Sequence, residues 1–192
     1  MSLKAEPVRI GKKGYKEAMD LMSSTFPPNE LIPLWILRLF ALRRNVRFRA
    51  FYDDDMFIGT VYTYEDDKHF FILYLAVDPK YRSMGYGGRI VDHAHILAEG
   101  RNIALDVESL DPGADNLEER ERRIAFYARH GIFDTGYDFT DDGESYYSVL
   151  SSDIDGFDMD AFVKMLRRFS FGLCRMKVSK REGCVQNHNS MV

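Results

Sequence analysis

The strongest constraint in this sequence is an unbroken apolar run at residues 70–77 that ends in a glycine-rich turn. A short run without polar alternation predicts a central strand buried on both faces. Behind it, Gly85, Gly87 and Gly88 introduce an amphipathic segment at residues 87–99, which predicts a helix that stops at Gly100. A buried strand, a tight turn and a helix in this order indicate a domain that combines strands and helices.

The hydrophobic periodicity of the remaining chain supplies further elements of both kinds. Period-two and apolar runs predict strands at residues 7–10, 46–50, 56–64, 102–107, 132–139 and 146–151. Helical spacing predicts helices at residues 12–24, 30–42, 117–130 and 158–169. Acidic turns at residues 53–55 and 141–143 join two of these strand pairs as hairpins. The expected fold class is therefore α/β or α+β with a mixed sheet.

Domain boundaries follow from the absence of internal repeats and low-complexity linkers in this chain. We expect one domain over residues 1–153 and a helical extension over residues 154–176. Beyond Met176 the sequence turns polar and patternless, so residues 177–192 are predicted to form a flexible tail.

Composition excludes several classes of protein. With 192 residues, 45% hydrophobic and 29% charged, the chain is globular. A net charge of -4 provides no basic field for nucleic acid. Cys174 and Cys184 lie outside any CxxC or Cys/His cluster, which argues against a disulfide scaffold or structural zinc. Residues 1–6 lack the apolar core of a signal peptide, and the apolar stretch at residues 31–42 is too short and interrupted to span a bilayer. We expect a cytoplasmic protein.

The glycine turn predicts an anion site. Peptide N–H groups in the first turn of a helix have no partner within the helix, and they point at the positive end of its dipole. Arg82 and Arg89 add positive charge nearby. The turn is neither a Walker loop, because no Gly-Lys-Ser/Thr follows, nor a GxGxxG motif, because Ile90 stands at the third position after Gly87. A tight turn that binds no ligand is the alternative.

At this point two motifs resemble those of the GNAT superfamily of N-acetyltransferases. Arg82-x-x-Gly85-x-Gly87 resembles the family's acyl-coenzyme A signature, and residues 124–133, with Tyr127 and Gly131, resemble its helix-end pattern. Together with the order of elements, the resemblance covers roughly residues 7–151. It implies a GNAT-like mixed, largely antiparallel twisted sheet with splayed central strands flanked by helices. The helix at residues 158–169 is extra to that fold.

The resemblance also implies a cosubstrate, acetyl-CoA, and no metal. Pantetheine would pair with main-chain groups of the strand end, and the pyrophosphate would lie on the amides of the turn. The cosubstrate-binding residues implied in this way are Leu75, Ala76, Val77, Arg82, Ser83, Met84, Gly85, Tyr86, Gly87, Gly88 and Tyr127. The expected partner is a primary amine on a small molecule or a protein, without nucleic acid or membrane, and a homodimer stays open.

The implied reaction is direct attack of the amine on the acetyl thioester in a ternary complex. Tyr127 matches the family's tyrosine acid, and an amide near Val77 would stabilise the oxyanion. Glu108, just past the strand at residues 102–107, is the candidate base, with Glu65 and Asp67 as weaker candidates. The alternative for Glu108 is a solvated carboxylate in a loop, without a catalytic role. On the side of the site that would receive the acceptor amine, we expect Phe26, Glu30 and Tyr64 to bind the substrate.

Two points remain open in the sequence. Arg120 stands where the family commonly has Asn two turns before the tyrosine, which weakens any transfer of that Asn's role. A non-catalytic acyl-CoA sensor or interaction module on the same fold is the alternative function.

Overall fold

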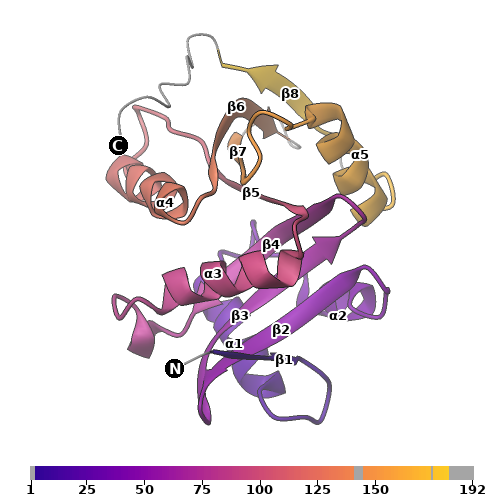
Figure 1. Ribbon diagram of the computed structural model, residues 1–192, viewed down its shortest axis with the longest axis vertical. Helices are drawn as coiled ribbons and strands as arrows, with labels where there is room; N and C mark the ends of the chain where they lie inside the picture. Colours follow the sequence, from indigo (N-terminus) through magenta and orange to yellow (C-terminus); the bar gives the residue numbers. More distant parts are fainter. Residues whose placement is uncertain (1–2, 141–144, 174, 182–192) are drawn as a thin grey trace. The chain divides into compact units, whose positions relative to one another are not determined.

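The computed structural model describes residues 3–140, 145–173 and 175–181 (Figure 1). The chain divides into two compact units, Met1–Leu105 and Asp106–Val192, and the boundary falls inside strand β5 (Asn102–Glu108). Each unit carries strands and helices of its own, so strands and helices mix along the whole described chain.

The first unit is built on β1 (Lys4–Pro7), β2 (Val46–Asp53), β3 (Met56–Glu65), β4 (His69–Val77) and the first part of β5. Their hydrogen-bonded order is β1-β2-β3-β4-β5. The first three pairings are antiparallel, and β4 pairs with β5 in parallel from His69↔Asn102 to Ile72↔Leu105. A mixed, mostly antiparallel sheet, as the sequence predicts, is confirmed.

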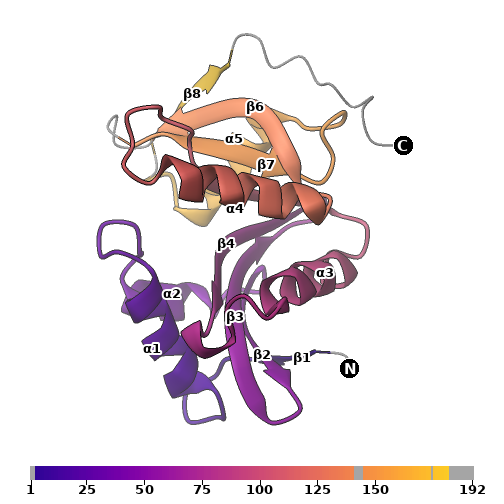
Figure 2. The same cartoon turned by 90° about the vertical axis from the view of Figure 1, so that its left-hand side faces the viewer.

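Helices cover both faces of this sheet. Figure 2 shows α1 (Tyr15–Thr25) and α2 (Leu34–Phe40) on one face and α3 (Tyr86–Ala98) on the other. Burial on both faces explains why β4 reads as an unbroken apolar run. The Tyr62 hydroxyl of β3 donates a buried hydrogen bond of 2.8 Å to the carbonyl of Leu37, which fixes α2 on the sheet.

The second unit contains the end of β5, α4 (Leu117–Arg129), β6 (Phe133–Thr140), β7 (Tyr147–Ser151), α5 (Met159–Phe169) and β8 (Lys177–Lys180). Its strand order is β5-β7-β6-β8, with β6 antiparallel to both β7 and β8. Figures 1 and 2 show α4 and α5 on opposite faces of the β6–β7 hairpin. The amphipathic pattern of α5 is realised as a buried face of Met159, Phe162, Met165, Leu166 and Phe169.

Three expected elements differ from the structure. The first strand lies at Lys4–Pro7 instead of residues 7–10, because its antiparallel pairing with β2 runs from Lys4↔Tyr52 to Pro7↔Arg49. The second helix is shorter than residues 30–42 and begins after Pro33, which stands at its N-cap. Residues 177–180 form β8, although they lack an apolar face, because main-chain pairing with β6 supports an exposed edge strand. Residues 141–143 and 182–192, expected as a turn and a tail, lie outside the described residues.

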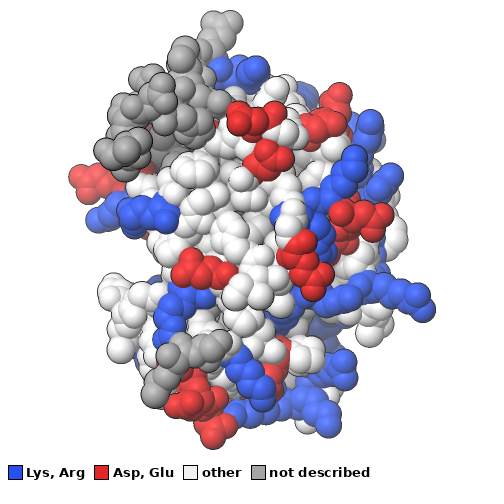
Figure 3. Space-filling model, in the orientation of Figure 1, with Lys and Arg blue, Asp and Glu red and all other residues white. Residues whose placement is uncertain are grey.

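Three further results concern membrane spans, surface charge and metal ligands in the described chain. None of its helices is both long and apolar enough to cross a membrane. Acidic and basic side chains both occur on the face seen in Figure 3. No group of three or more His, Cys, Asp or Glu side chains within the described residues is arranged to hold a metal ion.

Gly59 gives a prediction for stability. A Cβ at this position would lie 2.3 Å from the carbonyl oxygen of Ala76 on β4, so the two backbones approach closely only because Gly59 has no side chain. We expect Gly59→Ala to cost about 1–3 kcal/mol of unfolding free energy, measured by urea denaturation. Gly113→Ala, whose Cβ would meet only the Asp111 carboxylate at 3.4 Å, serves as the control. Equal midpoints for the two variants would contradict the close approach.

Candidate active site

The last residues of β4 turn their peptide groups to both edges of the strand. The Asp78 N–H donates to the Ile58 carbonyl of β3 at 2.8 Å, and the Ala76 carbonyl faces Gly59 on the same strand. Because peptide groups alternate along a strand, those of Leu75 and Val77 face the edge away from β3. The ladder to β5 ends at Ile72, before these residues. Leu75 and Val77 therefore lie beyond the paired part of that edge.

The turn after β4 leaves a run of amides without partners. Asp78 caps a short 3₁₀ turn, η1 (Pro79–Tyr81), by accepting the Lys80 N–H at 2.9 Å. Ser83 and Gly85 then take left-handed φ values of 61° and 80°, and Gly85 is the N-cap of α3. The first helical hydrogen bond runs from the Arg89 N–H to the Gly85 carbonyl at 3.2 Å.

Six consecutive amides precede that bond. Within the described chain, the N–H groups of residues 83–88 donate to no backbone or side-chain acceptor. Three of them belong to the first turn of α3, where the helix dipole favours negative charge. We call residues 82–88 the amide turn. Its geometry suits an anion with several oxygens, such as a diphosphate.

One side chain of β2, Asp53, fixes the amide turn in place. The Tyr86 hydroxyl and the Arg89 guanidinium each donate to the same oxygen of Asp53 at 2.9 Å. These two hydrogen bonds lower the pKa of the Asp53 carboxyl below its usual value, and the bond from Arg89 has the larger effect. The Arg89 guanidinium also lies 4.8 Å from the centre of the Tyr86 ring.

This anchoring corrects one sequence expectation. Arg89 was expected to add charge for an anion, but its guanidinium is paired with Asp53. Arg82 is exposed, and its Nε donates to the Val77 carbonyl at 3.2 Å. The sequence places Asp53 in a turn, whereas the structure makes it the last residue of β2, and nothing in the sequence connects it with residues 86 and 89.

The segment between α1 and α2 is hydrogen-bonded to β4. The Tyr74 hydroxyl accepts the Ile32 N–H and donates to the Glu30 carbonyl, both at 2.9 Å. The Phe26 ring lies 4.8 Å from the Tyr74 ring. Two residues expected on the acceptor side, Phe26 and Glu30, are thus attached to the residue that precedes Leu75. Tyr64 is different, because it is only 3% exposed and its ring lies 5.5 Å from the Arg43 guanidinium.

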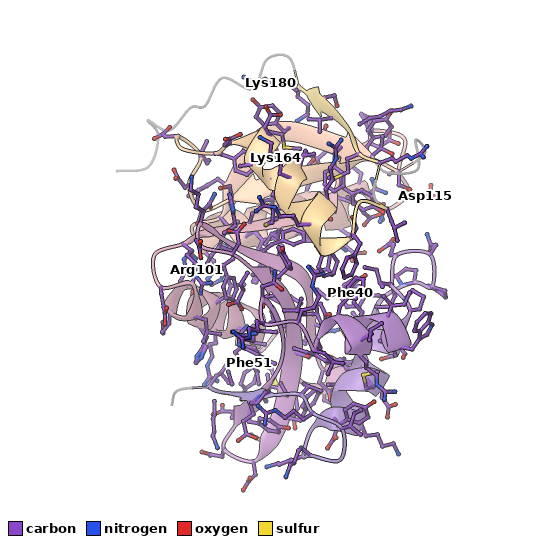
Figure 4. All side chains as sticks on the ribbon, turned by 90° about the vertical axis from the view of Figure 1, so that its right-hand side faces the viewer. Phe40, Phe51, Arg101, Asp115, Lys164 and Lys180 are labelled. Atoms are coloured by element: carbon purple, nitrogen blue, oxygen red, sulfur yellow. The ribbon has the colours of Figure 1, made fainter. Side chains whose placement is uncertain are left out.

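Glu65 belongs to a mostly buried ion network. Its two carboxylate oxygens accept hydrogen bonds from Arg49 at 2.8 Å and from Arg101, labelled in Figure 4, at 3.3 Å. Burial acts to raise the pKa of Glu65, but the pairing with Arg49, Thr63 and Arg101 outweighs it and lowers the pKa. Because this carboxylate is buried in the network and its pKa is lowered, it is a poor base. Asp67 is exposed on the adjoining turn.

In the second unit, two arginines of α4 hold Glu108. Its Oε1 accepts from Arg120 at 2.9 Å and its Oε2 from Arg123 at 3.2 Å. Arg120 also donates to the Asn116 amide oxygen at 2.8 Å and to the Ser109 carbonyl at 2.6 Å. The arginine that departs from the family's Asn therefore orders the end of β5. Sequence reasoning missed this pair, and the signal that could have found it is the spacing of three residues between Arg120 and Arg123, which puts both on one helix face.

Tyr127 lies on the last turn of α4 and is half-buried. Desolvation raises the pKa of its phenol to about 12. The positive charge of Arg123 lowers this pKa, and the negative charge of Asp106 raises it. The Phe126 ring packs at 5.1 Å. The phenol therefore stays protonated over the physiological range and can donate a hydrogen bond.

Comparisons with known proteins agree with this geometry. Residues 44–131 match the family model described as the acetyltransferase (GNAT) domain. This segment includes both motifs, the amide turn and the helix end with Tyr127. Among proteins with curated functions, none matches this sequence.

Solved structures show the same fold. A protein from Bacteroides thetaiotaomicron, assigned as a GNAT-family acetyltransferase, is 26% identical with a TM-score of 0.69; the match covers 88% of this chain and 98% of that one. A GNAT-family acetyltransferase from Elizabethkingia anophelis with acetyl-CoA bound is 14% identical, with a TM-score of 0.55 over 78% of this chain and 97% of that one. Arabidopsis thaliana Naa50, in complex with the bisubstrate analogue CoA-Ac-MVNAL, is 19% identical, with a TM-score of 0.55 over 79% and 98%.

The matched family model, the order of strands and helices and the similar structures lead to one conclusion: residues 44–131 match the GNAT acetyltransferase domain, and the chain has the fold of the GNAT-family acetyltransferases.

Proposed function

We propose that this protein transfers an acetyl group from acetyl-CoA to a primary amine of a small molecule or a protein. The observation that carries the proposal is the run of six amides at residues 83–88 without protein acceptors, directly after a buried strand. A neutral-to-acidic chain binds a diphosphate through such main-chain donors without a basic surface.

In this proposal, a different segment of the chain binds each part of acetyl-CoA. Its pyrophosphate accepts hydrogen bonds from the amides of Ser83, Met84, Gly85, Tyr86, Gly87 and Gly88 and from the exposed guanidinium of Arg82. Its pantetheine arm, which contains peptide units, pairs with the main chain of Leu75 and Val77 as an added strand does and passes Ala76 between them. The alternation of peptide groups on β4 supports this, because Leu75 and Val77 face away from β3.

The chemistry is the attack of a neutral amine on the thioester carbonyl. A C–N bond forms, the C–S bond breaks, and the amine loses a proton. We propose that the Val77 N–H stabilises the oxyanion and that Tyr127 faces the departing thiolate. A phenol with a pKa of about 12 is a weaker acid than a thiol with a pKa of about 8.5, so Tyr127 stabilises the thiolate by a hydrogen bond instead of giving up its proton.

Glu108 is the proposed base for the amine proton. Both of its oxygens accept guanidinium hydrogen bonds, and the longer of these, from the more exposed Arg123, is the one that opens to receive the proton. A lysine-like amine is neutral in about one molecule in 2,500 at pH 7, so a base has a large effect there.

Binding and turnover test the proposal separately. Calorimetry with acetyl-CoA is expected to show one site, and thiol release across a panel of polyamines, aminoglycosides, amino acids and peptides is expected to reveal an acceptor. Absence of acetyl-CoA binding at millimolar concentration overturns the proposal. Binding without thiol release for every amine instead identifies an acyl-CoA sensor.

The amide turn predicts a contrast between two substitutions of Gly87. Proline lacks an N–H but is tolerated in the first turn of a helix, whereas alanine keeps the N–H. Loss of a hydrogen bond to a charged group costs about 1.5–3 kcal/mol, which corresponds to about 10- to 150-fold in affinity. We expect Gly87→Pro to weaken acetyl-CoA binding by this factor in calorimetry and Gly87→Ala to weaken it less. Wild-type affinity in the proline variant would rule out this amide as a donor.

Tyr127→Phe is expected to lower kcat by about a hundredfold while the Kd for acetyl-CoA changes little. Because the pKa of Tyr127 is about 12, the phenol stays protonated as the pH rises to about 10. The wild-type rate should therefore rise with pH as the acceptor amine becomes neutral, without a fall from Tyr127 below pH 10. Thiol release measured from pH 6 to about 10 checks both points. An unchanged kcat in the phenylalanine variant would exclude the proposed role.

Glu108→Gln separates a base from a structural residue through its pH profile. A base matters most when the amine is protonated, so the loss in kcat/KM should be about 10²-fold near pH 7 and shrink toward the pKa of the amine. A variant that only disturbs Arg120 and Arg123 would lose the same factor at every pH. Glu119→Gln, which removes an exposed partner of Arg123 alone, is the matched control.

A further inference from the structure

The last strand of the second unit, β8, has one open edge (Figure 1). Among the described strands it pairs with β6 alone, from Lys177↔Thr140 to Lys180↔Tyr137. All four of its residues are exposed. An edge strand of this kind presents main-chain N–H and C=O groups to which another chain can add a strand. The open edge of β8 is therefore a candidate docking site.

One hydrogen bond determines which main-chain groups of β8 face outward. The Arg181 N–H donates to the Gly136 carbonyl of β6 at 2.8 Å. Because peptide groups alternate along an antiparallel strand, every second residue back from Arg181 also faces β6, and Val178 and Lys180 face the open edge. Within the described chain, the outward N–H and C=O groups of these two residues have no hydrogen-bond partner. Two donors and two acceptors are therefore available to an external strand.

The other edge of β8 is firmly attached to the second unit. Beyond the ladder with β6, the Arg181 guanidinium donates at 2.6 Å to the Asp138 carboxylate and at 2.6 Å to the Ser148 hydroxyl. It also pairs with the Asp134 carboxylate. Asp138 and Ser148 are both buried. A strand held in this way accepts a partner without first having to be ordered, which lowers the cost of binding.

The sequence around the open edge is basic. Residues 175–181 contain four Lys or Arg and no Asp or Glu, although the whole chain has a net charge of -4. Across residues 3–140, 145–173 and 175–181, no carboxylate forms an ion pair with Lys177 or Lys180. The ammonium of Lys180, labelled in Figure 4, lies 5.5 Å from the centre of the Tyr137 ring, which orients it without neutralising its charge. These charges favour an acidic partner.

We propose that the open edge of β8 binds an acidic segment of another protein as an added antiparallel strand. The outward groups of Val178 and Lys180 form four main-chain hydrogen bonds with that segment. In an antiparallel pair, the partner residue opposite Lys180 comes three positions before the one opposite Lys177. Acidic residues at these two positions and an apolar residue opposite Val178 give the pattern Glu-x-apolar-Glu. This docking is independent of the proposed acetyl transfer.

Two other occupants fit the open edge less well. A second copy of the chain, paired through its own β8, would bring the lysines of both copies together, and lysines on an edge strand commonly prevent such pairing. A phosphate-rich surface would neutralise Lys177 and Lys180 but would donate no hydrogen bonds to the outward carbonyls of the strand. An acidic extended segment satisfies both the charges and the main-chain groups.

The probe is a fluorescently labelled peptide with the core Glu-Thr-Val-Glu, titrated with the protein and followed by fluorescence anisotropy. We expect saturable binding of this peptide and none of its counterpart with the core Lys-Thr-Val-Lys. The valine N–H of the core donates to the Val178 carbonyl, so its N-methylation should weaken the affinity about tenfold or more. The threonine N–H faces away from β8, and its N-methylation should change the affinity little.

Variants of the protein test the same contacts from the other side. Val178→Pro removes an N–H that has no partner in the fold, so it should weaken peptide binding about tenfold or more and leave the midpoint of urea unfolding unchanged. Val178→Thr, which keeps the N–H, is the matched control and should bind as the wild type does. Lys177→Glu combined with Lys180→Glu should weaken binding by about tenfold.

Other results contradict the proposal. No saturable binding at millimolar concentration, or equal binding of the glutamate and lysine peptides, overturns it. Equal effects of the two N-methyl groups exclude an added strand, and this pair of peptides decides the point even where Val178→Pro fails to fold. Self-association of the protein that Val178→Pro abolishes, without binding of the peptide, assigns the open edge to a second copy instead.

Discussion

The satisfaction of main-chain hydrogen bonds governs this structure, because a buried peptide group without a partner is costly. On one edge, β4 is paired with β3 up to Val77, and on the other its ladder with β5 stops at Ile72. The chain then leaves six amides without protein acceptors at residues 83–88. Protein folds tolerate such groups only where solvent or a ligand reaches them. The main-chain groups that have no hydrogen-bond partner in the protein therefore mark the surface where a ligand can bind.

The side chains around these groups act as braces. Asp53 on β2 holds Tyr86 and Arg89, so the beginning of α3 is tied to a strand distant in sequence. Tyr74 on β4 ties down the segment before α2 through two main-chain bonds. In the second unit, Arg120 and Arg123 fix the Glu108 carboxylate. Loops that carry function are positioned by regular elements in this way.

Sequence patterns predicted the central elements well. The β2–β3 hairpin, β4, α3 and α4 lie within a few residues of their expected positions, because each has a clear period and a turn residue at its end. The pattern missed β8, whose four residues are all exposed and whose stability comes from pairing with β6. Pairing between strands that are distant in the sequence produces no periodic pattern of apolar residues.

The candidate site was predictable in its main chain and less so in its side chains. Glycine spacing identified the amide turn, since the local backbone requires it. The partners of Arg89 and Glu65 were not visible, because residues 53 and 89, or 49, 65 and 101, meet only after folding. Tyr64 was expected on the acceptor side but is buried beneath Arg43. Long-range ion pairs are set by the tertiary fold and not by local sequence.

The Arg49–Glu65–Arg101 network has a consequence for how this sequence can vary. Removing one member of a buried ion pair leaves an uncompensated charge at a cost of about 3–5 kcal/mol, while replacing the whole group by apolar side chains is often neutral. Single changes at these three positions are therefore penalised and joint changes are not. Homologues that lose Glu65 should have lost its arginine partners in the same lineage, so that positions 49, 65 and 101 evolve as one inherited unit.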